Sequence, residues 1–256
     1  MRRVAVLSDI HGNLPALEAV LADVERAGVD LIVLNGDLAD GPFPAETLDR
    51  LAALGGRAVW LRGNGDRWLA EAREGRFSHP DPATHALIAW ASARVGAEHW
   101  ERLRHLPTTH TLELPGLGEV GICHATPRSD NEMFLVDSAL DHHRAAFASM
   151  GAATIVAGHS HMPFDRLFDR RRMVNTGSVG MPYGHSGASW ALLGPDIVLR
   201  RTRYDLDQAA ARMLRSGMPG AEAFVGEYVH ATPGDEEALA AFHETLRRQQ
   251  EAGHFE

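Results

Sequence analysis

The sequence contains a single cysteine, Cys123, among its 256 residues. One cysteine cannot form an intramolecular disulfide, so the disulfide-stabilised class of small secreted domains is excluded and a reducing compartment is expected. Cys123 directly precedes His124, and two interpretations follow: a metal ligand, or a buried residue that ends a strand. We adopt the second, because free cysteine is among the most frequently buried residue types.

The sequence also lacks a long apolar segment and a basic net charge. Arg2 and Arg3 precede only a short apolar stretch that Asp9 interrupts, so we expect no signal peptide and no membrane-spanning helix, and a cytoplasmic protein. The net charge of -9 disfavours binding to long nucleic acid, which usually requires a basic face. A phosphate substrate is still compatible with it, because bound metal ions can reverse the local field. Nothing in the sequence indicates an oligomeric state.

The composition, with 45% hydrophobic and 23% charged residues, is ordinary for a globular protein. Internal repeats and a linker rich in Gly, Ser or Pro are both missing, so we predict a single domain over residues 1–256. Within it, residues 203–256 form a helical C-terminal extension, with one helix over 205–215 and another starting near residue 235. We expect this extension to pack as a cap; a lid or a dimer arm is the alternative.

Apolar periodicity places strands and helices in alternation along the first part of the chain, up to about residue 65, which predicts parallel strands joined by crossover helices. Helical pattern follows over 66–106, interrupted around 79–82, then a hairpin over 109–123 and a helix over about 138–150. Short strands in quick succession indicate a second, antiparallel or mixed sheet; they cover residues 164–168, 173–175, 189–193 and 197–202.

Five short apolar runs each end in side chains that can bind metal ions. The runs cover residues 4–7, 31–34, 58–61, 120–123 and 154–157, and their length and Gly or Asp boundaries indicate buried strands. If these strands are neighbours in one sheet, their carboxyl ends converge and their ligands meet at one edge. The candidate metal ligands are Asp9, His11, Asp37, Asn64, His124, His159 and His161.

Carboxylate and imidazole together suit a divalent transition metal, and seven donors are enough for two ions. Each motif alone is weak in a chain with 15 histidines; the repeated placement at strand ends is what chance explains poorly. We expect two ions of manganese, iron, zinc, nickel or cobalt. The remaining histidines are assigned no function: His142 and His143 are expected on a solvated helix face, and His185 in a loop.

The ordered set of these motifs resembles the calcineurin-like metallophosphoesterases over residues 4 to about 180. The segment from Asn175 to Gly180 is also similar to a turn of the small bacterial and archaeal phosphodiesterase branch of that family. The resemblance implies an α/β/β/α sandwich, that is, two packed mixed β-sheets flanked by helices, here with a C-terminal helical cap. It further implies two metal sites, one held by Asp9, His11, Asp37 and His161 and the other by Asp37, Asn64, His124 and His159.

The sequence departs from many family members after Asn64. They carry a histidine at the next position, which protonates the leaving group, whereas this chain has Gly65, as the small phosphodiesterase branch does. A general acid typically contributes a factor of about 10²–10⁴. Asp66 could replace the imidazole as a catalytic group, although a helix N-cap is the interpretation we favour for it.

We therefore expect a dinuclear-metal phosphoesterase that cleaves a small phosphodiester or nucleotide-type substrate with a metal-bridging hydroxide. Asn64 and His124 would orient the phosphate while binding metal, and residues 130–134 would shape the pocket. Arg128 is either a second phosphate contact or an exposed loop charge. The alternatives are a phosphomonoesterase, a dinucleoside polyphosphate hydrolase or, in another class, a metal-binding scaffold with weak catalysis. A purely structural metal site is disfavoured, because such sites are dominated by Cys and His.

Overall fold

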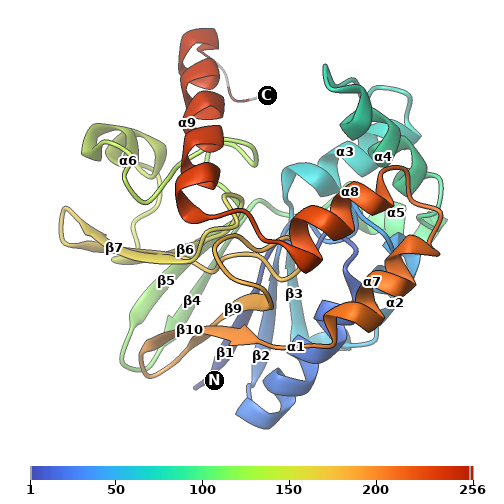
Figure 1. The fold of residues 1–256 in the computed structure, drawn as a ribbon. Helices are drawn as coiled ribbons and strands as arrows, with labels where there is room; N and C mark the ends of the chain where they lie inside the picture. Colours follow the sequence, from blue (N-terminus) through green and yellow to red (C-terminus); the bar gives the residue numbers. More distant parts are fainter. Residues whose placement is uncertain (1, 254, 256) are drawn as a thin grey trace.

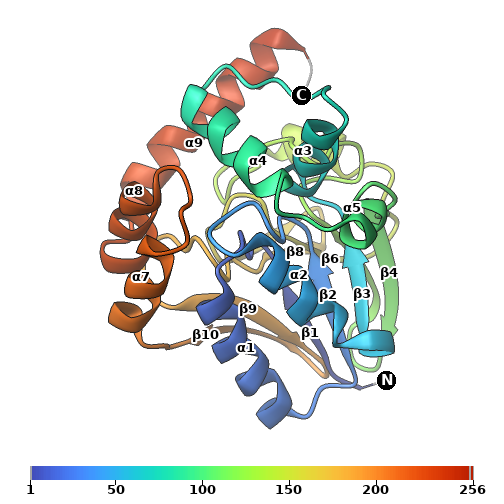
Figure 2. The ribbon, with the colours of Figure 1, turned by 90° about the vertical axis from the view of Figure 1, so that its right-hand side faces the viewer.

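The computed structural model describes residues 2–253 and 255, and within them the strands form two five-stranded sheets packed face to face. Helices cover the outer faces, so that the layers follow the order helix, sheet, sheet, helix (Figures 1 and 2). The first sheet has the order β10-β9-β1-β2-β3 and the second the order β4-β5-β6-β8-β7. The predicted fold class is confirmed.

The strands follow each other along the chain with these bounds: β1 Val4–Leu7, β2 Leu31–Asn35, β3 Ala58–Leu61, β4 Thr109–Leu114, β5 Gly118–Cys123, β6 Thr154–Ala157, β7 Phe164–Phe168, β8 Arg171–Asn175, β9 Ala188–Leu193 and β10 Ile197–Thr202. The first helices are α1 Leu14–Ala27, α2 Pro44–Ala52, α3 Asn64–Arg73, α4 Pro82–Ser92 and α5 Ala97–Leu103. The later ones are α6 Leu140–Ala146, α7 Leu206–Leu214, α8 Ala221–Val225 and α9 Asp235–Ala252. Two short turns, η1 Gly55–Arg57 and the π-helical η2 Gly226–His230, complete the assignment.

Strand β1 shows how the first sheet is buried on both faces. Val4 and Val6 pack into the core between the two sheets, whereas Ala5 and Leu7 pack against the helices on the outer side. Successive side chains of a strand point to opposite faces, so an apolar run without alternation predicts exactly such a two-sided burial. β1 pairs parallel with β2, and β2 parallel with β3, through the crossover helices α1 and α2.

Helix α1 forms where the sequence signals its two ends. The Asn13 side chain accepts a hydrogen bond from the Ala16 amide at the N-terminus, and Pro15 occupies the first turn. At the C-terminus Gly28 adopts a left-handed conformation, with φ at 64°. The buried stripe of the helix packs on the first sheet (Figure 2), and this fixes the position of the β1–α1 loop.

Several predicted details need correction. The five apolar runs do not share one sheet: β1, β2 and β3 lie in the first, and β5 and β6 in the second. Helix α6 covers only Leu140–Ala146, shorter than predicted, and α3 begins at Asn64. His143 is fully buried instead of solvated, because its ring stacks on Phe168, with centroids 5.1 Å apart, and its Nε2 lies 2.8 Å from an Arg166 nitrogen.

Helices α8 and α9 lie at the end of the sandwich opposite the N-terminus, where β1, β2 and β3 also end, whereas α7 lies along its side (Figure 1). Helix α7, α8 and η2 form one apolar cluster, in which Met213, Phe224 and Val229 are buried. Helix α9 packs through Leu246 on Met133 and Leu135. Within the described part of the chain, no helix is long and apolar enough to cross a membrane.

Candidate metal centre

The seven residues predicted as metal ligands meet at one end of the sandwich. Asp9 and His11 follow β1, Asp37 follows β2, and Asn64 begins the helix after β3. His124 follows β5, and His159 and His161 follow β6 in the second sheet. Because both sheets direct the carboxyl ends of these strands to the same end, the donors form a single cluster. Each of the seven residues is at most 8% exposed.

One half of the cluster consists of Asp9, His11 and His161. Nε2 of His161 lies 3.2 Å from Oδ1 of Asp9 and 3.1 Å from Nε2 of His11. Nε2 of His11 lies 3.8 Å from Oδ2 of Asp37, which connects this half to the other. Donor atoms this close together can hold a single metal ion.

The other half consists of Asp37, Asn64, His124 and His159. Nε2 of His124 lies 3.4 Å from Oδ2 of Asp37. One end of the Asn64 amide lies 3.3 Å from Nε2 of His124 and 3.0 Å from Nδ1 of His159. Asp37, His124 and His159 form a second group that could hold a metal ion. Asp37 therefore stands between the two halves.

Three of the four imidazoles are oriented by an acceptor on the side away from the cluster. Nδ1 of His11 lies 3.0 Å from Oδ2 of Asp40, and Nδ1 of His124 lies 2.8 Å from the Asn35 carbonyl oxygen. For His161 the acceptor is the carbonyl oxygen of Met181, at 2.9 Å. An acceptor at Nδ1 places the proton there and directs the Nε2 lone pair inward, as in metal-binding histidines.

Buried polar atoms in the cluster are left without a hydrogen bond among the described residues. These atoms are Oδ1 of Asp9, Nε2 of His159 and Oδ1 of Asp40. An unpartnered buried polar atom costs about 1–3 kcal/mol, and most such atoms in native proteins have a partner. Two of the three, Oδ1 of Asp9 and Nε2 of His159, belong to candidate ligands, and their lack of a partner fits residues that bind a cation.

The backbone at the cluster is strained in a consistent way. Among the described residues, seven that are not glycine have positive φ, and two of these form the tight β7–β8 turn. The other five are all candidate ligands: Asp9, His11, Asp37, His159 and His161. A left-handed residue other than glycine costs on the order of 1 kcal/mol or more and tends to occur at functional sites.

The electrostatics of the cluster couple its histidines and carboxylates. Burial lowers the pKa of His124, but Asp37 and Asp9 more than offset it and raise this pKa to about 10. Burial also lowers the pKa of His11, but the carboxylates of Asp40 and Asp37 outweigh this effect and raise the pKa to about 9. His159 differs, since burial and the neighbouring His124 lower its pKa to about 4. Positive charge is thus favoured at the centre of the cluster.

Both carboxylate oxygens of Asp66 are engaged by backbone amides. Its carboxylate accepts hydrogen bonds from the amides of Gly63, Asp37 and Leu38, at 2.9, 2.9 and 3.0 Å. It stands at the third position of α3 and accepts from the Gly63 amide, which is one half of a capping box, so the N-cap itself is Gly63 and not Asp66. The carboxyl group joins α3 to the β2 loop and holds Asp37 in place.

Gly65 closely faces Asp40. A Cβ atom at position 65 would lie 2.5 Å from Oδ2 of Asp40, the oxygen that orients His11. Asp40 was not among the predicted site residues, because the sequence gives no sign that this loop residue meets an imidazole. The only available signal was its position three residues after Asp37.

Arg128 forms an ion pair within its own loop. Its guanidinium pairs with the fully buried Glu132, with Nε to Oε2 at 2.8 Å, and lies over the Phe255 ring. A different carboxylate of this loop, Asp130, forms ion pairs with Arg62 and Arg67 at 3.0 Å each, and we call these three residues the Asp130 clamp. The backbone oxygen of Asp130 lies 3.2 Å from the Asn64 amide, so this clamp adjoins the cluster.

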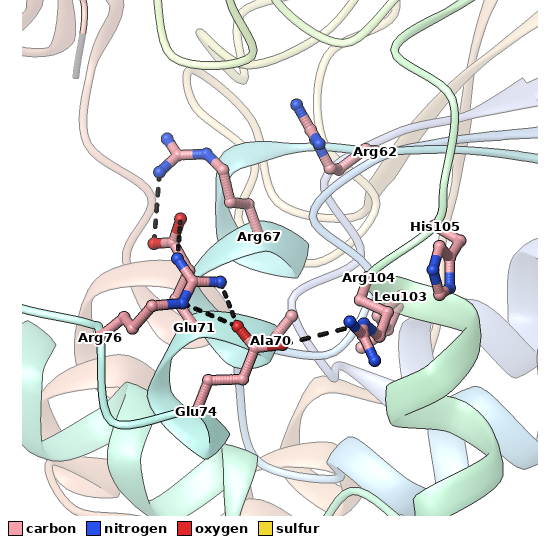
Figure 3. A pocket seen from close by; sticks show the side chains of 9 residues that line it. All are labelled: Arg62, Arg67, Ala70, Glu71, Glu74, Arg76, Leu103, Arg104 and His105. Carbon is pink, nitrogen blue, oxygen red and sulfur yellow. Dashed lines mark hydrogen bonds and ion pairs between the residues drawn. The ribbon is translucent and has the colours of Figure 1, made fainter.

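The two arginines that hold Asp130 also line a surface pocket of about 250 Å³. Figure 3 shows that Arg67 and Arg76 reach Glu71 and that Arg104 points to Glu74. Ion pairs therefore engage these guanidinium groups. Arg62 and Arg67 in the wall of this pocket thus stabilise the loop around Asp130. Neither the pocket nor the clamp was predicted from the sequence.

Comparison with known proteins places the chain in a family. Residues 2–196 match the calcineurin-like phosphoesterase superfamily domain. The phosphodiesterase YfcE of Escherichia coli is 25% identical over 77% of this chain and 90% of its own. An uncharacterised protein of Methanocaldococcus jannaschii is 27% identical over 87% of this chain and 98% of its own. A metallophosphoesterase structure from Sphaerobacter thermophilus has a TM-score of 0.69 and 27% identity, covering 90% of this chain and 98% of its own.

The fold and the comparisons agree on the class of protein, a metal-binding hydrolase of phosphoric esters. The chain belongs to the calcineurin-like phosphoesterase superfamily, and the predicted family and enzyme class are confirmed. The matched domain ends at residue 196, so the helices α7, α8 and α9 lie beyond it.

Proposed function

We propose that this protein is a dinuclear-metal phosphodiesterase that cleaves a small phosphodiester or nucleotide-type substrate. Asp9, His11, Asp37 and His161 would hold one ion. Asp37, Asn64, His124 and His159 would hold the other, with Asp37 shared. Manganese, iron, zinc, nickel and cobalt all accept such mixed oxygen and nitrogen donors. Residues 203–256 would belong to the same domain.

The observation that carries this proposal is the contact between two imidazoles. Nε2 of His11 and Nε2 of His161 lie 3.1 Å apart, and each ring has an acceptor at Nδ1. With the protons at Nδ1, two lone pairs face each other, and a cation beside both, either a metal ion or a second proton on His11, relieves their repulsion. Oδ1 of Asp9 is unpartnered and lies 3.2 Å from the same His161 atom, so it supplies a third donor.

Bound divalent ions would lower the pKa of a coordinated water and neutralise charge on the phosphoryl oxygens. The protein residues orient that chemistry. Asp40 and the carbonyl of Met181 hold the imidazoles of His11 and His161 with Nε2 inward. Asp66 holds the backbone amides of Asp37 and Gly63, so that the shared carboxylate and the α3 N-terminus keep their positions.

The choice of a diester follows from what the site offers the leaving group. Gly65 supplies no imidazole, and both Asp66 oxygens accept from backbone amides. Burial, followed by repulsion from Asp37, raises the pKa of Asp66 to about 8, but the amides occupy the group. A site with little acid assistance is best suited to esters whose leaving group is itself acidic. Arg128 pairs with Glu132 through Nε and Nη2, and a contact with a second phosphate stays a prediction for it.

The test is hydrolysis of bis-p-nitrophenyl phosphate and p-nitrophenyl phosphate by metal-stripped protein, before and after addition of manganese, nickel or zinc. The proposal expects metal-dependent turnover, with the diester faster than the monoester. Faster turnover of the monoester would instead favour a phosphomonoesterase. If neither ester is hydrolysed although metals are bound, the result would favour a metal-binding scaffold with weak catalysis.

The variant Asp37→Ala links the metals to the chemistry. It removes the carboxylate that lies within 3.8 Å of Nε2 of both His11 and His124. We expect loss of metal binding and of hydrolysis together. Intact hydrolysis with weaker metal binding would show that the shared-carboxylate role is wrong. Asp207→Asn, at a side chain that is 98% exposed, is the matched control and should change neither.

A further inference from the structure

Three aromatic residues cover the metal centre on the side of His161, and we name Tyr183, Tyr228 and Phe242 the aromatic cover. The Tyr183 ring lies on the His161 ring, with centroids 5.6 Å apart and the planes tilted by 30°. Tyr228 and Phe242 meet Tyr183 nearly edge-on, at 6.2 and 5.3 Å. The cover thus contains two of the three tyrosines in the chain.

Two members of the aromatic cover come from the helices beyond the matched family domain. Phe242 belongs to α9, and Tyr228 to the π-helical turn η2, both after residue 196. π-helical turns are rare and occur frequently at functional sites. Here the wider turn carries Tyr228 to the Tyr183 ring. The segment that distinguishes this chain from the matched domain therefore reaches a candidate metal ligand through only one intervening side chain.

Hydrogen bonds hold α9 on two loops that flank the metal centre. The Gln249 side chain donates to the Asn131 carbonyl at 2.6 Å and accepts from the Met133 amide at 2.8 Å. On the other side, the amide of Gly184 donates to the carbonyl of Pro233, just before α9, at 2.9 Å. The aromatic cover is therefore fixed relative to both the loop after His124 and the loop that contains Tyr183.

The charges around the aromatic cover limit what it can bind. The acidic side chains of Glu227 and Glu237 lie near Tyr183. Burial and Tyr183 raise the pKa of Tyr228. A second phosphate placed here would meet acidic side chains. A flat, uncharged group would instead meet the partly exposed rings of Tyr183, Tyr228 and Phe242.

We propose that the aromatic cover, with Tyr228 and Phe242 as its specificity-determining residues, binds an uncharged aromatic group esterified to the scissile phosphate. This inference rests on the proposed function, since the phosphoryl group would occupy the metal centre beside His161. Aromatic pairs prefer the offset and edge-to-face arrangements that Tyr183 already makes with its neighbours. The class of substrate is an aryl or nucleobase-bearing ester, in preference to an alkyl or polyphosphate ester.

The test compares two non-hydrolysable probes, phenylphosphonate and methylphosphonate, by calorimetry on the manganese-loaded full chain. The proposal expects wild-type protein to bind the phenyl compound about three- to tenfold more tightly, the range that one aromatic pair provides. Tyr228→Leu and Phe242→Leu keep apolar bulk but remove a flat ring, and each should bring the ratio toward one. Tyr204→Leu changes the third tyrosine, whose hydroxyl lies 3.4 Å from the Asn13 amide, and should keep the preference.

Equal binding of the two phosphonates by wild-type protein, or binding of neither, would overturn the proposal. An unchanged preference for phenylphosphonate in Phe242→Leu would also overturn it. This variant decides the question alone if Tyr228→Leu melts at a much lower temperature and cannot be interpreted. The proposed function fails in a different way: a protein that prefers phenylphosphonate but does not turn over bis-p-nitrophenyl phosphate would keep the binding surface and lose the phosphodiesterase assignment.

Discussion

The Nε2 atoms of His11 and His161 lie 3.1 Å apart at the end of a sandwich whose two sheets contribute one histidine each. The acceptors at their Nδ1 atoms hold both rings in this orientation. The residues around them also have left-handed backbone conformations, so the protein holds in place, at a cost in backbone strain, a pair of imidazoles that favours a positive charge beside it.

We therefore predict that divalent metal stabilises the fold. A ligand that binds only the folded state at about 100 times its dissociation constant contributes roughly 2.7 kcal/mol. For a protein of this size that corresponds to a rise in melting temperature of roughly 5–10 °C. Thermal unfolding of stripped protein with and without manganese measures the shift. An identical melting temperature in both samples would contradict a metal centre at these residues.

The second prediction concerns Asp40, which lies 3.0 Å from Nδ1 of His11 and is not a candidate ligand of either proposed ion. Partners that orient metal-binding histidines typically contribute 10–100-fold to metal affinity or activity. We expect Asp40→Ala to weaken metal binding by roughly that factor, and Asp40→Asn, which can still accept a hydrogen bond, to lose less. Titration with metal measures both. Equal, undiminished affinity in the two variants would remove the positioning role.

The sequence predicted the seven cluster residues because each follows an apolar run that ends at the same side of a sheet. That signal is local, because the apolar strand and the polar residues that follow it lie within about ten consecutive residues. Asp40, Asp130 and Tyr228 carried no such signal, since their contacts depend on where distant loops and helices pack. His143 was misplaced for the same reason, because α6 turns it toward Phe168 rather than to solvent.

The third prediction tests position 65, where this chain has glycine instead of the histidine that the family resemblance associates with leaving-group protonation. A Cβ there would lie 2.5 Å from Oδ2 of Asp40, so a larger side chain must displace the carboxylate that orients His11. We expect Gly65→His to lower the melting temperature and the turnover of p-nitrophenyl phosphate, instead of adding a useful acid. Gly56→His is the control, since a Cβ at Gly56 meets no atom within 4 Å. A gain in monoester turnover would refute the steric argument.

The fourth prediction concerns the clamp on Asp130. Arg67 binds this carboxylate through Nε and Nη2, at 3.1 and 3.0 Å, and the Asp130 backbone oxygen adjoins the Asn64 amide. Arg67→Gln leaves a nearly buried carboxylate with Arg62 alone. We expect a loss of about 1–3 kcal/mol in unfolding free energy, together with reduced kcat/KM. Arg76→Gln, in the same pocket but paired with Glu74, is the matched control. Equal effects of the two substitutions would argue against a specific role for the clamp.

The last prediction uses the buried imidazole of His143, which the proposed chemistry does not involve. Burial, followed by repulsion from Arg166 and His142, lowers its pKa from 6.5 to about 4. Below pH 6.5 the unfolded chain therefore binds a proton that the folded chain does not, so the unfolding free energy falls as pH drops from 6.5 to about 4 and changes no further below that. The contribution amounts to at most ~3 kcal/mol. The unfolding free energy, measured with urea, should change less with pH across this range in His143→Gln than in wild-type protein. The control His185→Gln, at an exposed position, should follow the wild-type curve. Identical pH dependence in His143→Gln and wild-type protein would mean that Arg166 and the aromatic rings around His143 do not suppress its protonation.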